Sequence, residues 1–276
     1  MIGSQRGFIA HLKNAVPGIL TVHCVIHRQH LVANNLSNEF FDTMWFVINA
    51  VNKIKAKSLN NRLFRELCHE NDEDFECLVL HTEVRWLSKG NCLIRFYNLF
   101  QTILEFLQPF DKQLYDELHT RETNILADIF EKLNEVNKNL QGDKINCIKS
   151  KSIISAFISK LSLFKKKISR REFNNFSNLS RSKQILDSDL EIYCAHLEFL
   201  KNIMSTRFKV INELIIPKWV LNPFLADIQN VQPLFQEELL EVMHNEEAKI
   251  DFKHNGYELF WLKQKTVYPQ LWKEVE

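Results

Sequence analysis

One short block, residues 81–90 (HTEVRWLSKG), carries residue types suited to contacting nucleic acid. It places Arg85 beside Trp86, between an apolar, strand-like run at 77–80 and a helical pattern over 91–107. A guanidinium group binds phosphate, and an indole ring stacks on unpaired bases with a typical gain of about 1–3 kcal/mol per base. The same pair is also typical of a core anchor at the start of a helix. Arg85 and Trp86 are therefore candidate nucleic-acid-binding residues, with packing as the alternative.

A second candidate surface is a run of basic residues in the third quarter of the chain. A phosphate backbone would favour such a patch, with an affinity that falls as salt rises. The alternative is a solvated helix end whose positive charges complement the helix dipole. The run comprises Lys160, Lys165, Lys166, Lys167, Arg170, Arg171, Arg181 and Lys183, and the candidate binding residues among them are Lys165, Lys166, Lys167, Arg170 and Arg171.

The densest set of potential metal ligands lies at 23–30 (HCVIHRQH). Cys24 and His27 have a Cys-x2-His spacing that could hold two corners of a zinc tetrahedron, and His30 could add a third. No second pair at a recognised spacing completes such a site. The favoured interpretation is a buried cysteine with hydrogen-bonded histidines that close a strand, and no metal is expected.

Catalytic chemistry has little support in the sequence. The acidic residues fall mostly at helix-surface positions, where solvated faces are the usual explanation. A glycine-rich phosphate loop, a GxSxG nucleophile elbow and an HExxH metal motif are all missing from the sequence. We therefore expect no enzyme activity and no cofactor.

Composition indicates a helical protein with reduced thiols. The chain has 276 residues, 21 phenylalanines, and only six glycines and six prolines, which favours long helices over a turn-rich sheet. Its formal net charge of +1 neither supports nor excludes DNA binding. Its six cysteines follow no disulfide pattern, and no run reaches the roughly 20 apolar residues of a membrane span. A soluble, intracellular protein without membrane contact is expected.

Hydrophobic periodicity predicts a mainly α fold with a small β part. The short β-branched run at 19–26 (ILTVHCVI) is typical of a buried strand. Residues 169–188 look like a loop with at most one short turn. Apolar residues at intervals of three and four predict helices over 39–54, 59–68, 91–107 (ended by Pro109), 125–140, 153–164, 190–214 and 236–250.

Several separated segments resemble transposases of the hAT superfamily and the host proteins derived from them, of the zinc-finger BED domain-containing and SCAN domain-containing protein 3 types. The resemblance covers nearly the whole chain, and its segments occur in family order. They are 1–8 (MIGSQRGF), 22–31 (VHCVIHRQHL), 51–64 (VNKIKAKSLNNRLF), 81–90, 126–142 (LADIFEKLNEVNKNLQG), 219–224 (WVLNPF) and 268–272 (YPQLW).

This resemblance implies an RNase H-like core interrupted by a helical insertion. Residues 1–33 would be a remnant of the core (a strand and the start of a helix), residues 34–256 the insertion, and residues 257–276 a return toward the core. Cys24 and His27 would match a Cys-x-x-His pair beside the former active site. Trp86 would match an insertion-domain tryptophan associated with handling DNA ends.

The family's catalytic Asp-Asp-Glu triad matches no residue of this chain, because the resemblance places all three carboxylates outside these 276 residues. We therefore expect a truncated, domesticated and catalytically inactive protein. Its expected location is the nucleus, or the cytoplasm if a nuclear signal has been lost. The candidate partners are DNA, a second copy of the chain, or other transposase-like proteins, and the alternative function is a protein-interaction scaffold that does not bind nucleic acid.

Overall fold

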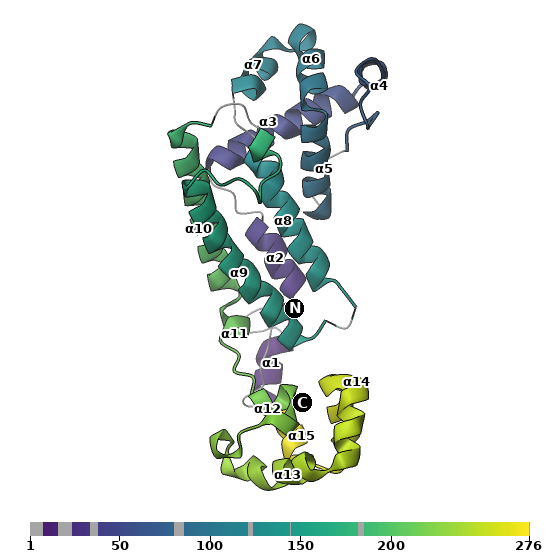
Figure 1. The fold of residues 1–276 in the computed structure, drawn as a ribbon. Helices are drawn as coiled ribbons and strands as arrows, with labels where there is room; N and C mark the ends of the chain where they lie inside the picture. The colour runs from purple at the N-terminus through teal and green to yellow at the C-terminus, as the bar shows by residue number, and fades with distance from the viewer. Residues whose placement is uncertain are drawn as a thin grey trace. The chain divides into compact units, whose positions relative to one another are not determined.

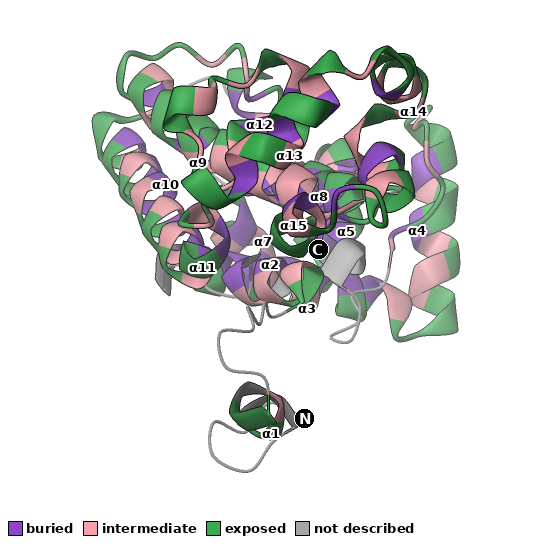
Figure 2. Cartoon of the chain, turned by 90° about the horizontal axis from the view of Figure 1, so that it is seen from below, coloured by how far each residue is buried: buried purple, intermediate pink, exposed green. Residues whose placement is uncertain are grey.

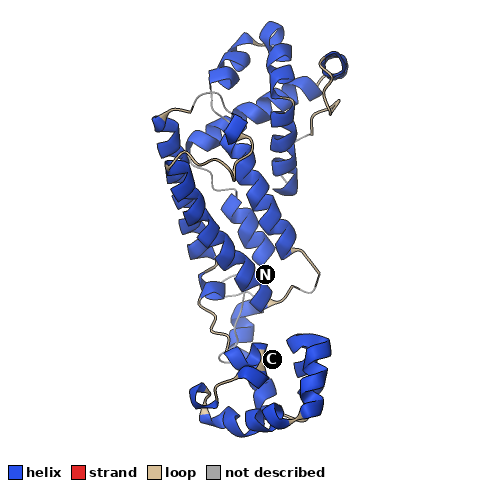
Figure 3. Cartoon of the chain, viewed as in Figure 1, coloured by secondary structure: helices blue, strands red, loops and turns tan. Residues whose placement is uncertain are grey.

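The computed structural model describes residues 8–15, 24–33, 38–79, 86–120, 124–143, 145–181 and 185–275. Every regular element within these ranges is a helix (Figure 3), which confirms the mainly α prediction. The predicted strand at 19–26 lies largely outside the described residues. Where it is described it is wrong, because Val25 and Ile26 form the first turn of α2 (Val25–Ala33). Apolar β-branched residues can sit in a short helix when that helix packs on others, and periodicity over so few residues does not separate the two states.

By internal contacts the chain divides into two units, Met1–Glu213 and Leu214–Glu276. The first unit contains α1 (Phe8–Ala15), α2, α3 (Asn38–Lys55), α4 (Ser58–Glu70), α5 (Trp86–Asn98), α6 (Phe100–Phe110), α7 (Lys112–Thr120), α8 (Asn124–Leu140), α9 (Cys147–Ser169), the 3-10 turn η1 (Leu179–Arg181), α10 (Asp187–Arg207) and α11 (Lys209–Asn212) (Figure 1).

Helix α8 is central to the first unit. All seven apolar positions predicted for its stripe are buried, from Ile125 to Leu140. It packs against α2, α5 and α9, and α9 in turn pairs along its length with α10. The α9–α10 pair is antiparallel, because Ser155 near the start of α9 bonds Asn212 after α10, whereas Lys165 near its end bonds Glu198.

Helix boundaries differ from the periodic pattern where a cap or a break intervenes. The helix predicted over 91–107 begins earlier, at Trp86, and is divided at Leu99 into α5 and α6, which ends directly after Pro109. The helix predicted over 236–250 is divided at Asn245, whose side chain accepts the backbone N–H of Ala248 at 3.0 Å. An asparagine in this capping role starts a new helix, because it satisfies a free N–H of the first turn.

The second unit has an aromatic core. It contains α12 (Lys218–Leu221), η2 (Pro223–Leu225), η3 (Ile228–Asn230), α13 (Pro233–His244), α14 (Glu246–Gln264) and α15 (Pro269–Val275). The rings of Trp219 and Trp261 meet edge to face with centroids 5.6 Å apart, and the Trp261 indole N–H donates to the carbonyl of Val220 at 2.8 Å. Segments 219–224 and 257–276 of the resemblance therefore pack within one unit. The division at 33 and 256 into core, insertion and return segment stays a prediction.

Buried and exposed residues alternate along many of the described helices, as the colouring of Figure 2 shows, whereas residues 125–130 of α8 are all buried. In α3 the buried residues include Phe40, Met44 and Ile54, but Phe41 and Trp45 of the predicted stripe are 62% and 54% exposed. The apolar stripe of α3 is thus wider than the face it buries. None of the described helices combines the length and apolarity needed to cross a membrane.

Candidate nucleic-acid interface

Three of the segments that carry the family resemblance meet at the middle of α8. Gln29 of α2 is fully buried, and its side-chain amide donates to the carbonyl of Leu133 at 2.9 Å. Gly90 of α5 lies against the side chain of the next residue, Asn134. The segments 22–31 and 81–90 are therefore held together by adjacent residues of segment 126–142. We call Gln29, Gly90, Leu133 and Asn134 the α8 junction.

Gly90 allows the close approach of α5 to α8. A Cβ atom at this position would lie 1.9 Å from Nδ2 of Asn134 and 2.7 Å from its Cγ, far inside van der Waals contact. Asn134 is only 4% exposed, so its side chain has little room to move away. Within the block 81–90, Gly90 thus has a packing role that the Arg-Trp interpretation did not consider.

The structure describes only the backbone of Trp86 in the Arg-Trp pair. Arg85 lies outside the described residues, and Trp86 is the first residue of α5, with a side chain that is also outside the description. The position of Trp86 at a helix start agrees with both interpretations of the pair. Its stacking role stays a prediction.

Cys24 and His27 lie at the start of α2, where both are exposed. The expectation of a buried cysteine that closes a strand is wrong, because Cys24 immediately precedes a helix and its carbonyl accepts the N–H of Arg28 at 3.0 Å. In the described part of the chain, histidine, cysteine and acidic residues form no group of three or more that could hold a metal ion. The assignment of Cys24 and His27 to the edge of a former active site stays a prediction.

Three of the five candidate cations near the end of α9 are bonded to other parts of the protein. Lys165 and Lys201 both contact the carboxylate of Glu198, at 3.2 and 3.1 Å. Hydrogen bonds from Lys201 and Lys165 hold the pKa of this carboxyl below its ordinary value. Lys167 donates to the side-chain oxygen of Asn175 at 2.7 Å. These bonds tie α9 to α10 and to the loop that follows α9.

Arg171 is the third bonded cation. Its guanidinium donates to the carbonyl of Ile185 at 3.0 Å and to the carboxylate of Asp187 at 2.6 Å. Its backbone has a φ of 59°, which is uncommon for a residue with a side chain. Arg171 directly follows the C-cap of α9, and its side chain links this end of α9 to the start of α10. Arg171 therefore has a structural role.

Lys166 and Arg170 differ from these three. Both are exposed, and neither side chain has a hydrogen-bond or ion-pair partner among the described residues. They are four residues apart at the last turn of α9, so they lie on the same side of it. We call Lys166 and Arg170 the α9 cation pair. Its charge complements the α9 dipole and is also available to an external anion.

A buried carboxylate that sequence reasoning missed organises the loop after α9. Asp128 of α8 is 1% exposed and accepts from the backbone N–H groups of Asn178 and Leu179 at 3.1 and 2.9 Å. It also accepts from the side chains of Ser177 and Asn178, at 3.3 and 2.9 Å. The signal was available, because Asp128 stands among apolar residues on the buried stripe of α8. A buried acid with this many donors fixes a loop.

The comparisons with known proteins agree with the helical part of this picture. The FAM200/GTF2IRD2 helical domain family matches residues 23–169, which is more than half of the chain and runs from the start of α2 to the end of α9. The General transcription factor II-I repeat domain-containing protein 2 of Bos taurus is 29% identical over 283 aligned residues. The alignment covers 98% of this chain and 29% of that protein, so the chain spans less than a third of the relative's length.

No solved structure matches the chain significantly. The family match nevertheless covers the α8 junction and three of the five candidate α9 residues, Lys165, Lys166 and Lys167. It supports the resemblance to domesticated transposase-like proteins. The chain belongs to the FAM200/GTF2IRD2 helical domain family.

Proposed function

We propose that this chain is a transposase-derived, non-catalytic helical protein that associates with DNA through the α9 cation pair. The observation that carries the proposal is that Lys166 and Arg170 are exposed and unpaired among the described residues, while Lys165, Lys167 and Arg171 beside them are bonded internally. The bonded cations hold the surface in place and contribute background charge. The free pair makes the contact with phosphate.

Electrostatics favours phosphate as the ligand of this pair. A net charge of +1 over the whole chain gives no general attraction to DNA, so any binding has to come from a local concentration of positive charge. Each phosphate neutralised by a cation releases counterions and adds about 0.9 to the salt slope of duplex binding. Two cations give weak, sequence-independent contact, which fits a domain that acts as part of a larger assembly.

Family membership supports the origin that we propose. We assign the chain to the hAT type, with residues 1–33 and 257–276 as remnants of an RNase H-like core, on the ordered segments of the resemblance. None of the family's catalytic carboxylates matches a residue of this chain, so we propose no catalysis. The relative's printed name refers to a general transcription factor, which supports nuclear localisation. Protein partners in this proposal are a second copy or other transposase-like proteins.

The alternative function is a protein-interaction scaffold without nucleic-acid binding. The internal bonds of Lys165, Lys167 and Arg171 favour it, because they give three of the five candidate cations a structural use. The scaffold does not need the α9 cation pair.

A gel-shift titration with the full chain, duplex DNA and a hairpin DNA separates these two functions. We expect binding at low salt that weakens steeply as salt rises, whereas absence of binding at the lowest salt would leave the scaffold. DNA cleavage that depends on Mg²⁺ or Mn²⁺ would overturn the non-enzyme proposal. Trp86→Ala tests the stacking role, which requires weaker hairpin binding with unchanged helicity by circular dichroism.

A further inference from the structure

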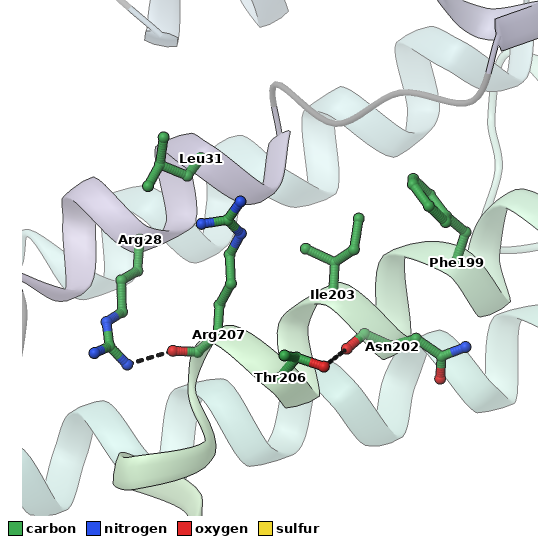
Figure 4. A pocket seen from close by; sticks show the side chains of 7 residues that line it. All are labelled: Arg28, Leu31, Phe199, Asn202, Ile203, Thr206 and Arg207. Carbon is green, nitrogen blue, oxygen red and sulfur yellow. Dashed lines mark hydrogen bonds between the residues drawn. The ribbon is translucent and has the colours of Figure 1, made fainter.

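A cleft of about 640 Å³ separates α2 from the C-terminal half of α10. Its walls are formed by one turn of α2, with Arg28 and Leu31, and by the α10 face that carries Phe199, Ile203 and Arg207 (Figure 4). The volume is within the range of small-molecule sites in proteins. The cleft lies within the first unit and does not include the α9 cation pair.

Both charged side chains among the described lining residues of the cleft are positive. Arg28 and Arg207 are its two charged lining residues, and their side chains run past each other from opposite walls (Figure 4). Arg28 donates to the backbone carbonyl of Arg207, which uses one of its five N–H donors. The Arg207 guanidinium has no hydrogen-bond or ion-pair partner among the described residues. Both guanidinium groups thus retain donors for an anion.

The remainder of the cleft is apolar and includes one accessible ring. Leu31 and Ile203 line its middle, and the ring of Phe199 at its far end is 40% exposed. Phe199 and Arg207 are two turns apart on the same face of α10, and the Arg207 side chain extends from α10 toward α2 (Figure 4). The side-chain amide of the exposed Asn202 adds a donor and an acceptor beside this ring.

We propose that this cleft binds a nucleotide phosphate ester, with the phosphate at the Arg207 guanidinium and the base against Phe199. Arginine binds phosphate through its planar fork of donors, and an exposed aromatic ring stacks on a base whatever its sequence. The absence of carboxylates among the lining residues makes the cleft selective for anions. The site deepens the proposed association with nucleic acid, but it uses residues that the α9 cation pair does not share.

The nucleotide can come from two sources, a free mononucleotide or an unpaired single strand. Saturation-transfer difference NMR of the full chain with AMP and with adenosine, together with titration calorimetry of inorganic phosphate, defines the chemistry. We expect the adenine protons of AMP to receive saturation and adenosine to bind at least fivefold more weakly. Fluorescence anisotropy with a labelled octamer of deoxyadenosine then distinguishes the sources, because tighter binding of the octamer than of AMP indicates a strand.

Two variants and two matched controls test the residues. Arg207→Gln should weaken AMP binding roughly tenfold, since it removes a charge-assisted contact. Phe199→Leu should weaken AMP binding about fivefold and leave binding of inorganic phosphate unchanged. The controls are Lys209→Gln, which removes an equal charge from an exposed side chain outside the cleft, and Phe110→Leu, which shortens an exposed ring elsewhere. Equal AMP affinity in wild type and Arg207→Gln would overturn the proposal.

The outcomes separate this proposal from the DNA-binding function of α9. AMP binding that depends on Arg207, in a protein that fails to bind duplex DNA, would support the cleft and remove the proposed function. Duplex binding that depends on Lys166 and Arg170, without detectable AMP binding, would remove only the cleft.

Discussion

The α8 junction, where segments of the family resemblance meet, and the α9 cation pair, a candidate DNA contact, are built in different ways. At the α8 junction, Gln29 and Asn134 are buried, and Gly90 is required because any side chain would collide with Asn134. At the end of α9 the candidate side chains are partly or fully exposed, and only the side chains of Lys166 and Arg170 are free of partners among the described residues. The segments that identify the family thus contribute packing, whereas the free charge lies outside them.

Asp128 links α8 to the loop that follows α9. Of the changes considered, its removal should lower the free energy of unfolding the most. Asp128→Ala leaves the buried backbone N–H of Leu179 without an acceptor and releases the loop after α9. We expect a loss of about 3–4 kcal/mol in the free energy of unfolding, because a buried carboxylate with several donors is lost. Urea denaturation measures the loss, and faster hydrogen exchange at residues 177–179 should accompany it. A change below about 1 kcal/mol would contradict the role of Asp128 as the link.

Gly90→Ala tests the packing at the α8 junction. We expect it to lower the free energy of unfolding by about 2–3 kcal/mol, because the new methyl group overlaps Asn134 in a filled interior. In the double variant Gly90→Ala/Asn134→Ala, most of that loss should be recovered relative to Asn134→Ala alone. Chemical denaturation of the four proteins gives the coupling energy. Additive losses would show that Gly90 and Asn134 do not meet as the structure places them.

Both regions are easier to explain in the structure than to predict from the sequence. The seven apolar positions of α8 are all buried as predicted, because a long helix with a strong apolar stripe is stable only when that stripe packs against other helices. The loop predicted over 169–188 is found at 170–181 and 185–186, but it contains turns at 174–175 and 177–178 in addition to η1, and residues 169, 187 and 188 belong to α9 and α10. Which cations are free was not predictable, because Lys165 and Lys166 are neighbours and differ only in whether a carboxylate of α10 lies within reach.

Buried polar groups mark a second limit of prediction. His196 of α10 is 1% exposed, and its ring meets that of Phe40 edge to face with centroids 4.3 Å apart. Neither ring nitrogen has a hydrogen-bond partner in the structure. Helical periodicity places residue 196 on a face of α10 but cannot show that a distant residue of α3 completes its surroundings.

The free energy of unfolding of the first unit should therefore depend on pH through His196. Burial lowers the pKa of His196 from 6.5 to about 3, so the unfolded chain binds the proton more tightly than the folded chain. The contribution of this neutral histidine is complete above pH 6.5 and is lost as pH falls, with about 2 kcal/mol gone by pH 5. Urea denaturation between pH 7 and 5 should show this loss, and His196→Phe should reduce it. An unchanged slope in the variant would assign the pH dependence to other groups.

A smaller effect on stability, but a visible one on binding, is expected from Glu198→Gln. This variant frees Lys165 and Lys201 and removes a negative charge from the α9 surface. We expect less than about 1 kcal/mol of destabilisation, since the side chains of this network are about one third to two fifths exposed. Affinity for duplex DNA at low salt should rise a few-fold. Glu213→Gln is the matched control, because it removes the same charge from a carboxylate that is 65% exposed and contacts only Lys209 at 3.8 Å. An equal rise in the control would indicate a general charge effect.

The most direct test of the account is the salt slope of duplex binding for the variant Lys166→Gln/Arg170→Gln. The control is Lys57→Gln/Lys112→Gln, which removes two exposed lysines of the same unit, one at the N-cap of α4 and one at the start of α7. We predict that the logarithmic salt slope falls by about 2 in the first variant, since two phosphate contacts are lost, and stays within error of wild type in the control. Equal slopes and affinities for the two variants would contradict the claim that the α9 cation pair is the DNA contact.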